Sequence, residues 1–166
     1  MSLIEPALFV YTALITDART LRIPNWTWIA IVLAYLARAA AMPATVDPLL
    51  DASIGVGVFA TGWILHALGW KFPFAPGDWK LLAAAALWLG PDNTLVCVLV
   101  MGVLGALMSA GVLLGRNNPW AFKAVITLMP ALGRPGAQAN VIPYGLAIGA
   151  GALVAMWLQA VQHGVI

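Results

Sequence analysis

The chain has 166 residues, of which 63% are hydrophobic and 8% are charged, and its mean hydropathy is +0.94. Soluble domains carry about 25% charged residues, so this composition excludes a water-exposed globular protein and indicates an integral membrane protein. The formal net charge of +2 therefore gives no indication of nucleic-acid binding. We expect membrane lipid around the protein and no nucleic-acid partner.

The chain contains six apolar runs, at 3–16, 26–42, 50–70, 79–90, 93–115 and 141–161. Five polar breaks separate them, at 17–25, 43–49, 71–78, 91–92 and 116–140. The runs are continuous rather than alternating, which favours helices over a β-barrel. The first run lacks a basic n-region and a cleavage site, so we expect it to be a retained span. The sequence thus predicts an all-α, multi-pass membrane protein with six transmembrane helices in a single domain, 1–166.

Basic residues concentrate in or beside the odd-numbered breaks, namely Arg19, Arg22, Lys71, Lys80, Arg116, Lys123 and Arg134. The second break has Arg38 beside Asp47 and Asp51, and the fourth has only Asp92. Because cytoplasmic loops carry the excess of Lys and Arg, the odd breaks are predicted to be cytoplasmic and both termini non-cytoplasmic. This orientation places Asp17 and Asp78 on the same side of the membrane.

The lengths of the runs predict the depth of these two aspartates. A helix needs about 20 residues to cross the hydrocarbon core. The run 3–16 reaches that length only if its helix continues through Asp17, and the run 79–90 would have to include Asp78, tilt, or open onto water. Both carboxyl groups are therefore expected just inside the membrane, where ionisable side chains usually face the bundle interior or a water-filled cavity.

Two carboxyl groups that share one proton can perform acid–base hydrolysis. The ionised group takes a proton from water, and the protonated group donates one to a carbonyl oxygen. The neighbours favour an irregular backbone, because Pro24 interrupts a helix and Pro76-Gly77 precedes Asp78 directly. The competing interpretation, which the residues alone leave open, is that Asp17 and Asp78 pair with Arg19 and Lys80.

Other chemistries lack the residues that they need. The single cysteine, Cys97, excludes a disulfide within the chain and a CxxC zinc site. No HExxH motif is present, and His66 and His163 stand alone. The segment around Ser109 lacks the glycine of a G-x-S-x-G elbow. We therefore expect no metal and no cofactor.

Three segments resemble the type IV prepilin peptidases. TDARTLRIPN (16–25) is similar to their first motif, in which I-P-N follows an aspartate. APGDWKLLAAAALWLGP (75–91) is similar to their second motif, G-x-G-D-x-K-L, with Ala75-Pro76 in place of the first glycine and its neighbour. VIPYGLAIGAGAL (141–153) is similar to their closing P-Y-G segment. The order and spacing of the segments agree with the family across the whole chain.

The resemblance implies an intramembrane aspartyl peptidase that removes the basic leader from prepilins or pseudopilins at the cytoplasmic face of the bacterial inner membrane. It implies Asp17 and Asp78 as the catalytic pair. Pro24, Asn25, Gly77 and Lys80 are implied as supporting motif residues. No methyltransferase segment is recognisable, as in the short members of tight-adherence (Flp-type) pilus systems.

Three alternatives remain open at this point. An archaeal-type preflagellin peptidase shares the two-aspartate plan. A non-enzymatic membrane subunit of a pilus or secretion assembly would use both aspartates in structural ion pairs. A small transporter would use a carboxyl group for proton coupling. The sequence predicts neither the particular substrate nor the oligomeric state.

Overall fold

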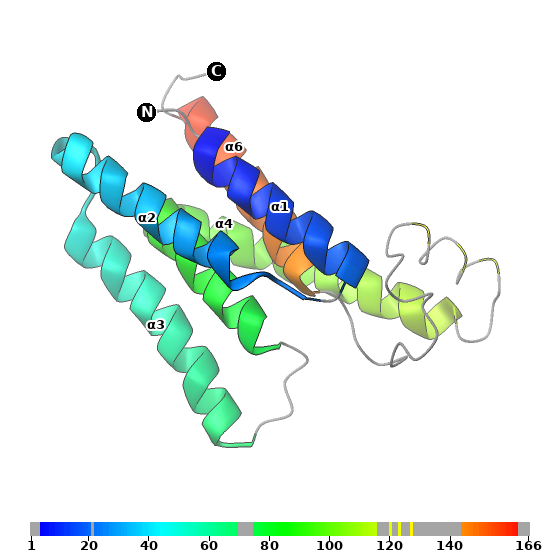
Figure 1. Ribbon diagram of the computed structural model, residues 1–166. Helices are drawn as coiled ribbons and strands as arrows, with labels where there is room; N and C mark the ends of the chain where they lie inside the picture. Colours follow the sequence, from blue (N-terminus) through cyan, green and yellow to red (C-terminus); the bar gives the residue numbers. More distant parts are fainter. Residues whose placement is uncertain are drawn as a thin grey trace.

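The computed structural model describes residues 4–20, 22–69, 75–115 and 144–162, together with 120, 123 and 127. In chain order the elements are α1 (Ile4–Thr20), α2 (Asn25–Ala41), the 3-10 helix η1 (Pro43–Thr45), α3 (Pro48–Ala67), α4 (Pro76–Gly115) and α6 (Tyr144–Gln162). Every regular element in this part of the chain is helical (Figure 1), so the predicted all-α fold is confirmed there. Most of the predicted break 116–140 and His163 lie outside the described residues.

Three of the described helices are long and apolar enough to cross a membrane, namely Pro48–Ala67, Pro76–Leu113 and Tyr144–Gln162. α1 and α2 have 17 residues each, slightly fewer than the roughly 20 that a span needs. The helices thus support a membrane protein. The count of six spans and the outward location of both termini stay predictions.

The end of α1 and the start of α2 follow from local sequence. α1 continues through Asp17 to Thr20. This continuation was predicted because the apolar run 3–16 alone is too short to cross a membrane. Within α1 the threonine hydroxyls donate to carbonyls one turn back, for example Thr16 Oγ1 to Thr12 O at 2.8 Å, which satisfies them in an apolar helix. Pro24 then takes an extended backbone (φ −61°, ψ 136°), and α2 begins at the next residue. Thr27 secures this start, because its hydroxyl and its amide both donate to Pro24 O.

α4 consists of two limbs that meet at Gly90, where the chain changes direction (Figure 1). Gly90 has φ +70° and ψ −176°, the left-handed region that glycine tolerates, and Pro91 then opens the second limb. Thr94 Oγ1 donates to Ala86 O at 3.3 Å. Eight residues of straight helix would separate these positions by about 12 Å, so this contact requires a sharp bend. The prediction of a polar break at 91–92 is therefore wrong in position: these residues are helical, and the helix is interrupted one residue earlier, at Gly90.

A buried polar contact joins three helices at this bend. Tyr35 of α2 donates its hydroxyl to Asp51 Oδ2 of α3 at 2.8 Å. The other oxygen, Asp51 Oδ1, lies against Gly90, 3.2 Å from where a Cβ would be. On the same side of the bundle, the Arg38 guanidinium lies 5.2 Å from the ring centroid of Trp88. The sequence had grouped Asp51 with the charges of a loop, whereas the structure buries it among the helices.

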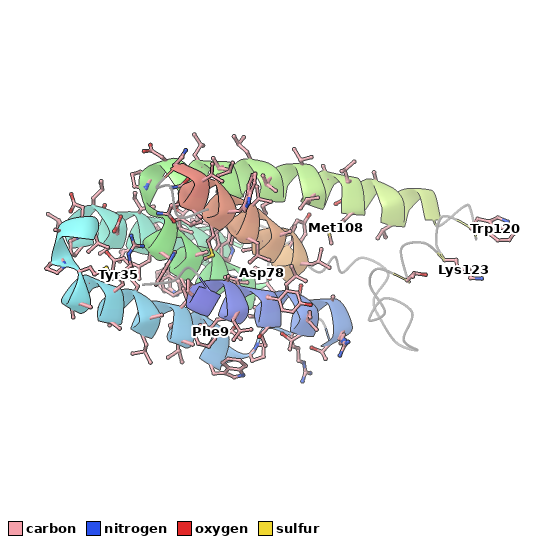
Figure 2. All side chains as sticks on the ribbon, turned by 90° about the horizontal axis from the view of Figure 1, so that it is seen from above. Phe9, Tyr35, Asp78, Met108, Trp120 and Lys123 are labelled. Atoms are coloured by element: carbon pink, nitrogen blue, oxygen red, sulfur yellow. The ribbon has the colours of Figure 1, made fainter. Side chains whose placement is uncertain are left out.

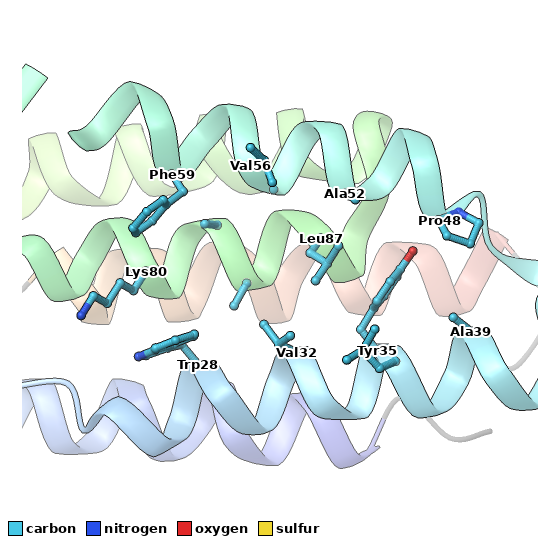
Figure 3. A pocket seen from close by; sticks show the side chains of 14 residues that line it. Trp28, Val32, Tyr35, Ala39, Pro48, Ala52, Val56, Phe59, Lys80 and Leu87 are labelled. Atoms are coloured by element: carbon cyan, nitrogen blue, oxygen red, sulfur yellow. The ribbon is translucent and has the colours of Figure 1, made fainter. Parts of the chain in front are cut away.

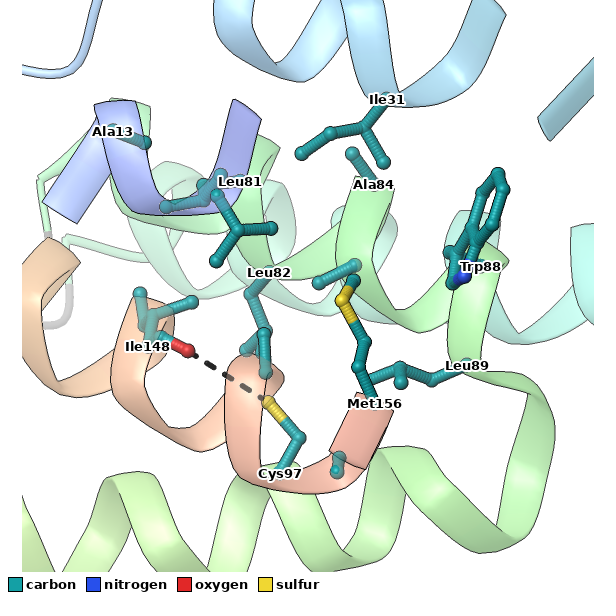
Figure 4. Packing of buried hydrophobic residues seen from close by; sticks show 14 of the residues in the cluster. Ala13, Ile31, Leu81, Leu82, Ala84, Trp88, Leu89, Cys97, Ile148 and Met156 are labelled. Carbon is teal, nitrogen blue, oxygen red and sulfur yellow. Dashed lines mark hydrogen bonds between the residues drawn. The ribbon is translucent and has the colours of Figure 1, made fainter. Parts of the chain in front are cut away.

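The core is centred on α6, which packs against both α1 and the second limb of α4. Its buried face consists mainly of glycine and alanine, beside Ile148, Met156 and Gln159, and the small residues let the helices approach closely. At Gly151 a Cβ would lie 2.6 Å from the backbone oxygen of Cys97. Cys97 is fully buried, and its Sγ lies 4.0 Å from Ile148 O (Figure 4). This close packing fixes where the first turn of α6 meets α1.

Candidate active site

Asp17 is held by the beginning of α6. Its side chain is 4% exposed, and its Oδ2 accepts a hydrogen bond from the Leu146 N–H at 3.2 Å. The backbone amide of Gly145 also interacts with this carboxyl group. The first amides of a helix have no partner within the helix and carry a partial positive charge. They are therefore suited to hold a carboxylate inside an apolar bundle.

The contact between α1 and α6 leaves no room for a side chain at Gly145. A Cβ there would lie 2.7 Å from Asp17 Oδ2 and 2.8 Å from Asp17 Cγ. It would also lie 2.8 Å from Ile23 Cδ1. Glycine is thus required because the backbone of α6 approaches the Asp17 carboxyl group directly.

Asp78 is held by the beginning of its own helix. Its side chain is 5% exposed, and its Oδ2 accepts from the Ala75 N–H at 2.8 Å. The Asp78 amide donates in return to Ala75 O at 2.9 Å. This reciprocal arrangement corresponds to the acidic half of a capping box. Pro76 occupies the first helical position, where a fixed φ is favourable, so Ala75-Pro76 is compatible with this geometry.

The fold brings the two aspartates together from helices about sixty positions apart in the chain. Both side chains are buried, and Asp78 lies in the interior of the helix bundle (Figure 2). Ile23 connects their surroundings. Its Cβ is 3.7 Å from where a Cβ of Gly77 would be, and its Cδ1 faces Gly145. The I-P-N segment therefore packs against both carboxyl-bearing regions.

The other predicted motif residues occupy the rim of this site. Pro24 sets the start of α2, and the exposed Asn25 accepts from Trp28 Nε1 at 3.4 Å. Gly77 forms the first turn of α4 against Ile23. The Lys80 ammonium lies over the Trp28 ring, 5.8 Å from its centroid.

The ion-pair interpretation predicted Arg19 and Lys80 as partners of the aspartates. The hydrogen bonds that reach Asp17 and Asp78 instead come from backbone amides, and Lys80 contacts Trp28. Among the described residues, no group of three or more His, Cys, Asp and Glu side chains could hold a metal ion. The site contains two buried carboxyl groups whose surroundings meet at Ile23. Two carboxyl groups are the set of groups that acid–base chemistry on water requires.

The sequence interpretation missed the residues of α6 that hold Asp17. Gly145 and Leu146 belong to the P-Y-G segment, which had been noted only as a motif. Two glycines and a proline at the start of an apolar run were the available signal, since glycine permits close approach of a backbone to another group. Nothing in the local pattern indicated that this approach would be to Asp17.

Fold and site together define a helical membrane protein with an internal pair of acidic groups. The model of the type IV leader peptidase family matches residues 6–110, a range that includes Asp17 and Asp78. The chain belongs to this family, as its motifs indicated, and is thus a leader peptidase-type membrane protein. Comparisons with curated proteins and with solved structures find no match.

Proposed function

We propose that this protein is an aspartic-type peptidase that removes the basic leader from prepilins or pseudopilins. The proposed location is the cytoplasmic face of a bacterial inner membrane. One observation carries the proposal: Asp17 and Asp78 are both buried, each is anchored by a backbone amide, and their surroundings meet at Ile23. Family membership supports the peptidase activity. The basic residues Arg19 and Arg22 beside Asp17 support the cytoplasmic side.

In the proposed mechanism the two aspartates share one proton. The ionised carboxylate removes a proton from a water molecule, and the water oxygen forms a bond to the scissile carbonyl carbon. The protonated carboxyl group gives its proton to the carbonyl oxygen. The tetrahedral intermediate then collapses: the C–N bond breaks, the amine leaves with a proton from one carboxyl group, and a hydroxyl of the intermediate returns its proton to the other carboxylate, which restores the shared proton. The products are a carboxylic acid and an amine, and no covalent enzyme intermediate forms.

The anchoring of each carboxyl group supports this division of roles. Leu146 and Ala75 each hold the Oδ2 of one aspartate, which fixes the orientation of both groups before substrate binds. Holding the reacting groups in a fixed orientation accounts for a large part of the rate increase of an enzyme over the reaction in water. The non-helical residues 22–24 next to Asp17 also provide a short extended segment at the site, where a peptide substrate can approach the pair.

Replacing each carboxyl group by an amide tests the proposal. Asp17→Asn and Asp78→Asn should each abolish leader cleavage of a co-expressed prepilin, because neither group alone can act as acid and base in one step. The matched control is Asp92→Asn, an exposed aspartate of the same helix α4, which should cleave at the wild-type rate. All three should insert in the membrane equally. Normal processing by either Asp17→Asn or Asp78→Asn would show that the pair is structural.

A further inference from the structure

A cavity of about 590 Å³ lies between α2, α3 and α4 (Figure 3). Among the described helices, α2 and α3 each pack closely on α4, and they approach each other at the Tyr35–Asp51 hydrogen bond. The space between them is open, with α4 as its floor. We call this cavity the α2–α3 groove. The length of the groove, the side chains that line it and its position relative to Asp78 together indicate what kind of molecule binds there.

The groove runs parallel to its helices. Its lining begins at Trp28 on α2 and ends at Ala39, and on α3 it extends from Phe59 to Pro48 (Figure 3). At 1.5 Å per residue this is about 16 Å, roughly half of the hydrocarbon thickness of a membrane. An occupant would therefore lie along the direction in which the helices cross the membrane.

The lining of the groove is apolar. The Tyr35 hydroxyl donates to Asp51, and the Lys80 ammonium lies over Trp28, so the polar groups of both lining residues are engaged. The floor is formed by small side chains such as Ala83 and Ala84 of α4, which let another backbone approach closely. The walls expose large apolar side chains, and Val56 is 66% exposed. These features favour an apolar peptide segment with its backbone near α4.

One end of the groove lies at the level of the candidate active site along α4. Lys80 lines the groove and follows Asp78 by two residues on the same helix. We propose that the α2–α3 groove binds the apolar segment that follows the scissile bond of the substrate. This inference rests on the proposed function. A bond held at Asp78 would leave the basic leader on the cytoplasmic side and direct the following apolar residues past Lys80 into the groove.

Filling the groove tests its role. Ala52 is exposed on α3 and lines the groove, so Ala52→Phe adds an aromatic ring there without displacing a buried side chain. Ala106 is exposed on the second limb of α4 and lies outside the groove lining, so Ala106→Phe is the matched control. We expect A52F to slow cleavage of a full-length prepilin about tenfold through a higher KM, since it removes the contact area of one apolar side chain. A106F should match the wild type, and thermal unfolding should show both variants folded.

Photocrosslinking identifies the occupant directly. With a photoreactive residue at position 52 in the Asp78→Asn background, the adduct should map to the apolar segment after the scissile bond. The same residue at position 106 should give no such adduct. Cleavage by A52F at the wild-type rate, or adducts at position 52 with lipid alone, would overturn the groove proposal and leave the proposed function in place. If the unmodified chain does not cleave prepilin at all, the proposed function fails, and the groove proposal fails with it.

Discussion

The contact between Gly145 and Asp17 makes a quantitative prediction for Gly145→Ala. The new Cβ would lie 2.7 Å from Asp17 Oδ2 and 2.8 Å from Ile23 Cδ1. Reaching an ordinary contact distance requires a shift of about 0.7 Å, since such contacts begin near 3.4 Å. Ile23 can rotate its terminal methyl group. The Asp17 carboxyl group cannot move without weakening its hydrogen bond from Leu146, which is 3.2 Å long.

The expected effect of Gly145→Ala falls on the rate rather than on the fold. Overpacking of this kind costs about 1–3 kcal/mol of stability, and the gain in helix propensity from Gly to Ala returns about 1 kcal/mol. A displacement approaching 1 Å of a catalytic group lowers a rate by about 10²-fold. We therefore expect kcat to fall by about 10- to 100-fold with KM nearly unchanged. The assay is cleavage of a purified prepilin in liposomes, with thermal unfolding measured on the same samples.

Two further glycines provide the controls for Gly145→Ala. A Cβ at Gly102 would meet no atom within 4 Å, so Gly102→Ala should keep both activity and stability. A Cβ at Gly151 would lie 2.6 Å from the backbone oxygen of Cys97, so Gly151→Ala should lower stability without contacting Asp17. Wild-type kcat in a folded Gly145→Ala protein would refute the reasoning, because Asp17 would then not depend on α6 for its catalytic orientation.

Three other predictions concern the acid–base mechanism and the orientation of the chain. Cleavage should follow a bell-shaped pH profile, because protonation of both aspartates removes the base and ionisation of both removes the acid; a rate that rises steadily with pH would indicate a single base. Chelators should leave cleavage unchanged, and activity lost to a chelator and restored by zinc would contradict the mechanism. Since the native Cys97 is buried, Arg22→Cys should be labelled from the cytoplasm and Asp92→Cys from the opposite side; the reverse pattern would invert the proposed topology.

Local features of the sequence predicted the helices and their ends. Apolar runs gave the helical segments, and Pro24 gave the start of α2. The polar break expected at 91–92 lies one residue from the observed bend at Gly90. Each of these depends on residues within a few positions of one another. The inclusion of Asp17 in α1 also followed, because a minimum length is needed to cross a membrane. For Asp78 the same length argument left a tilted helix or a water-filled cavity equally open.

The contacts between helices could not be predicted from local sequence features. Whether Asp17 faces Leu146, or Asp51 faces Tyr35, depends on how each helix is rotated about its axis, and apolar runs that are hydrophobic on all sides give no preferred face. Lys80 illustrates the point. Sequence proximity favoured a pair with a carboxyl group, whereas the structure directs its ammonium to the face of Trp28.

The break at Gly90 also affects the lipid around the protein. The limb from Pro76 to Gly90 is about 21 Å long at 1.5 Å per residue, whereas the hydrocarbon core of a bilayer is about 30 Å thick. A limb that short is in hydrophobic mismatch, which bilayers accommodate by thinning locally. Asp78 stands at the end of this limb, so local thinning of the bilayer would bring bulk water closer to it. Lipid chain length thereby becomes a variable of the hydrolytic reaction itself.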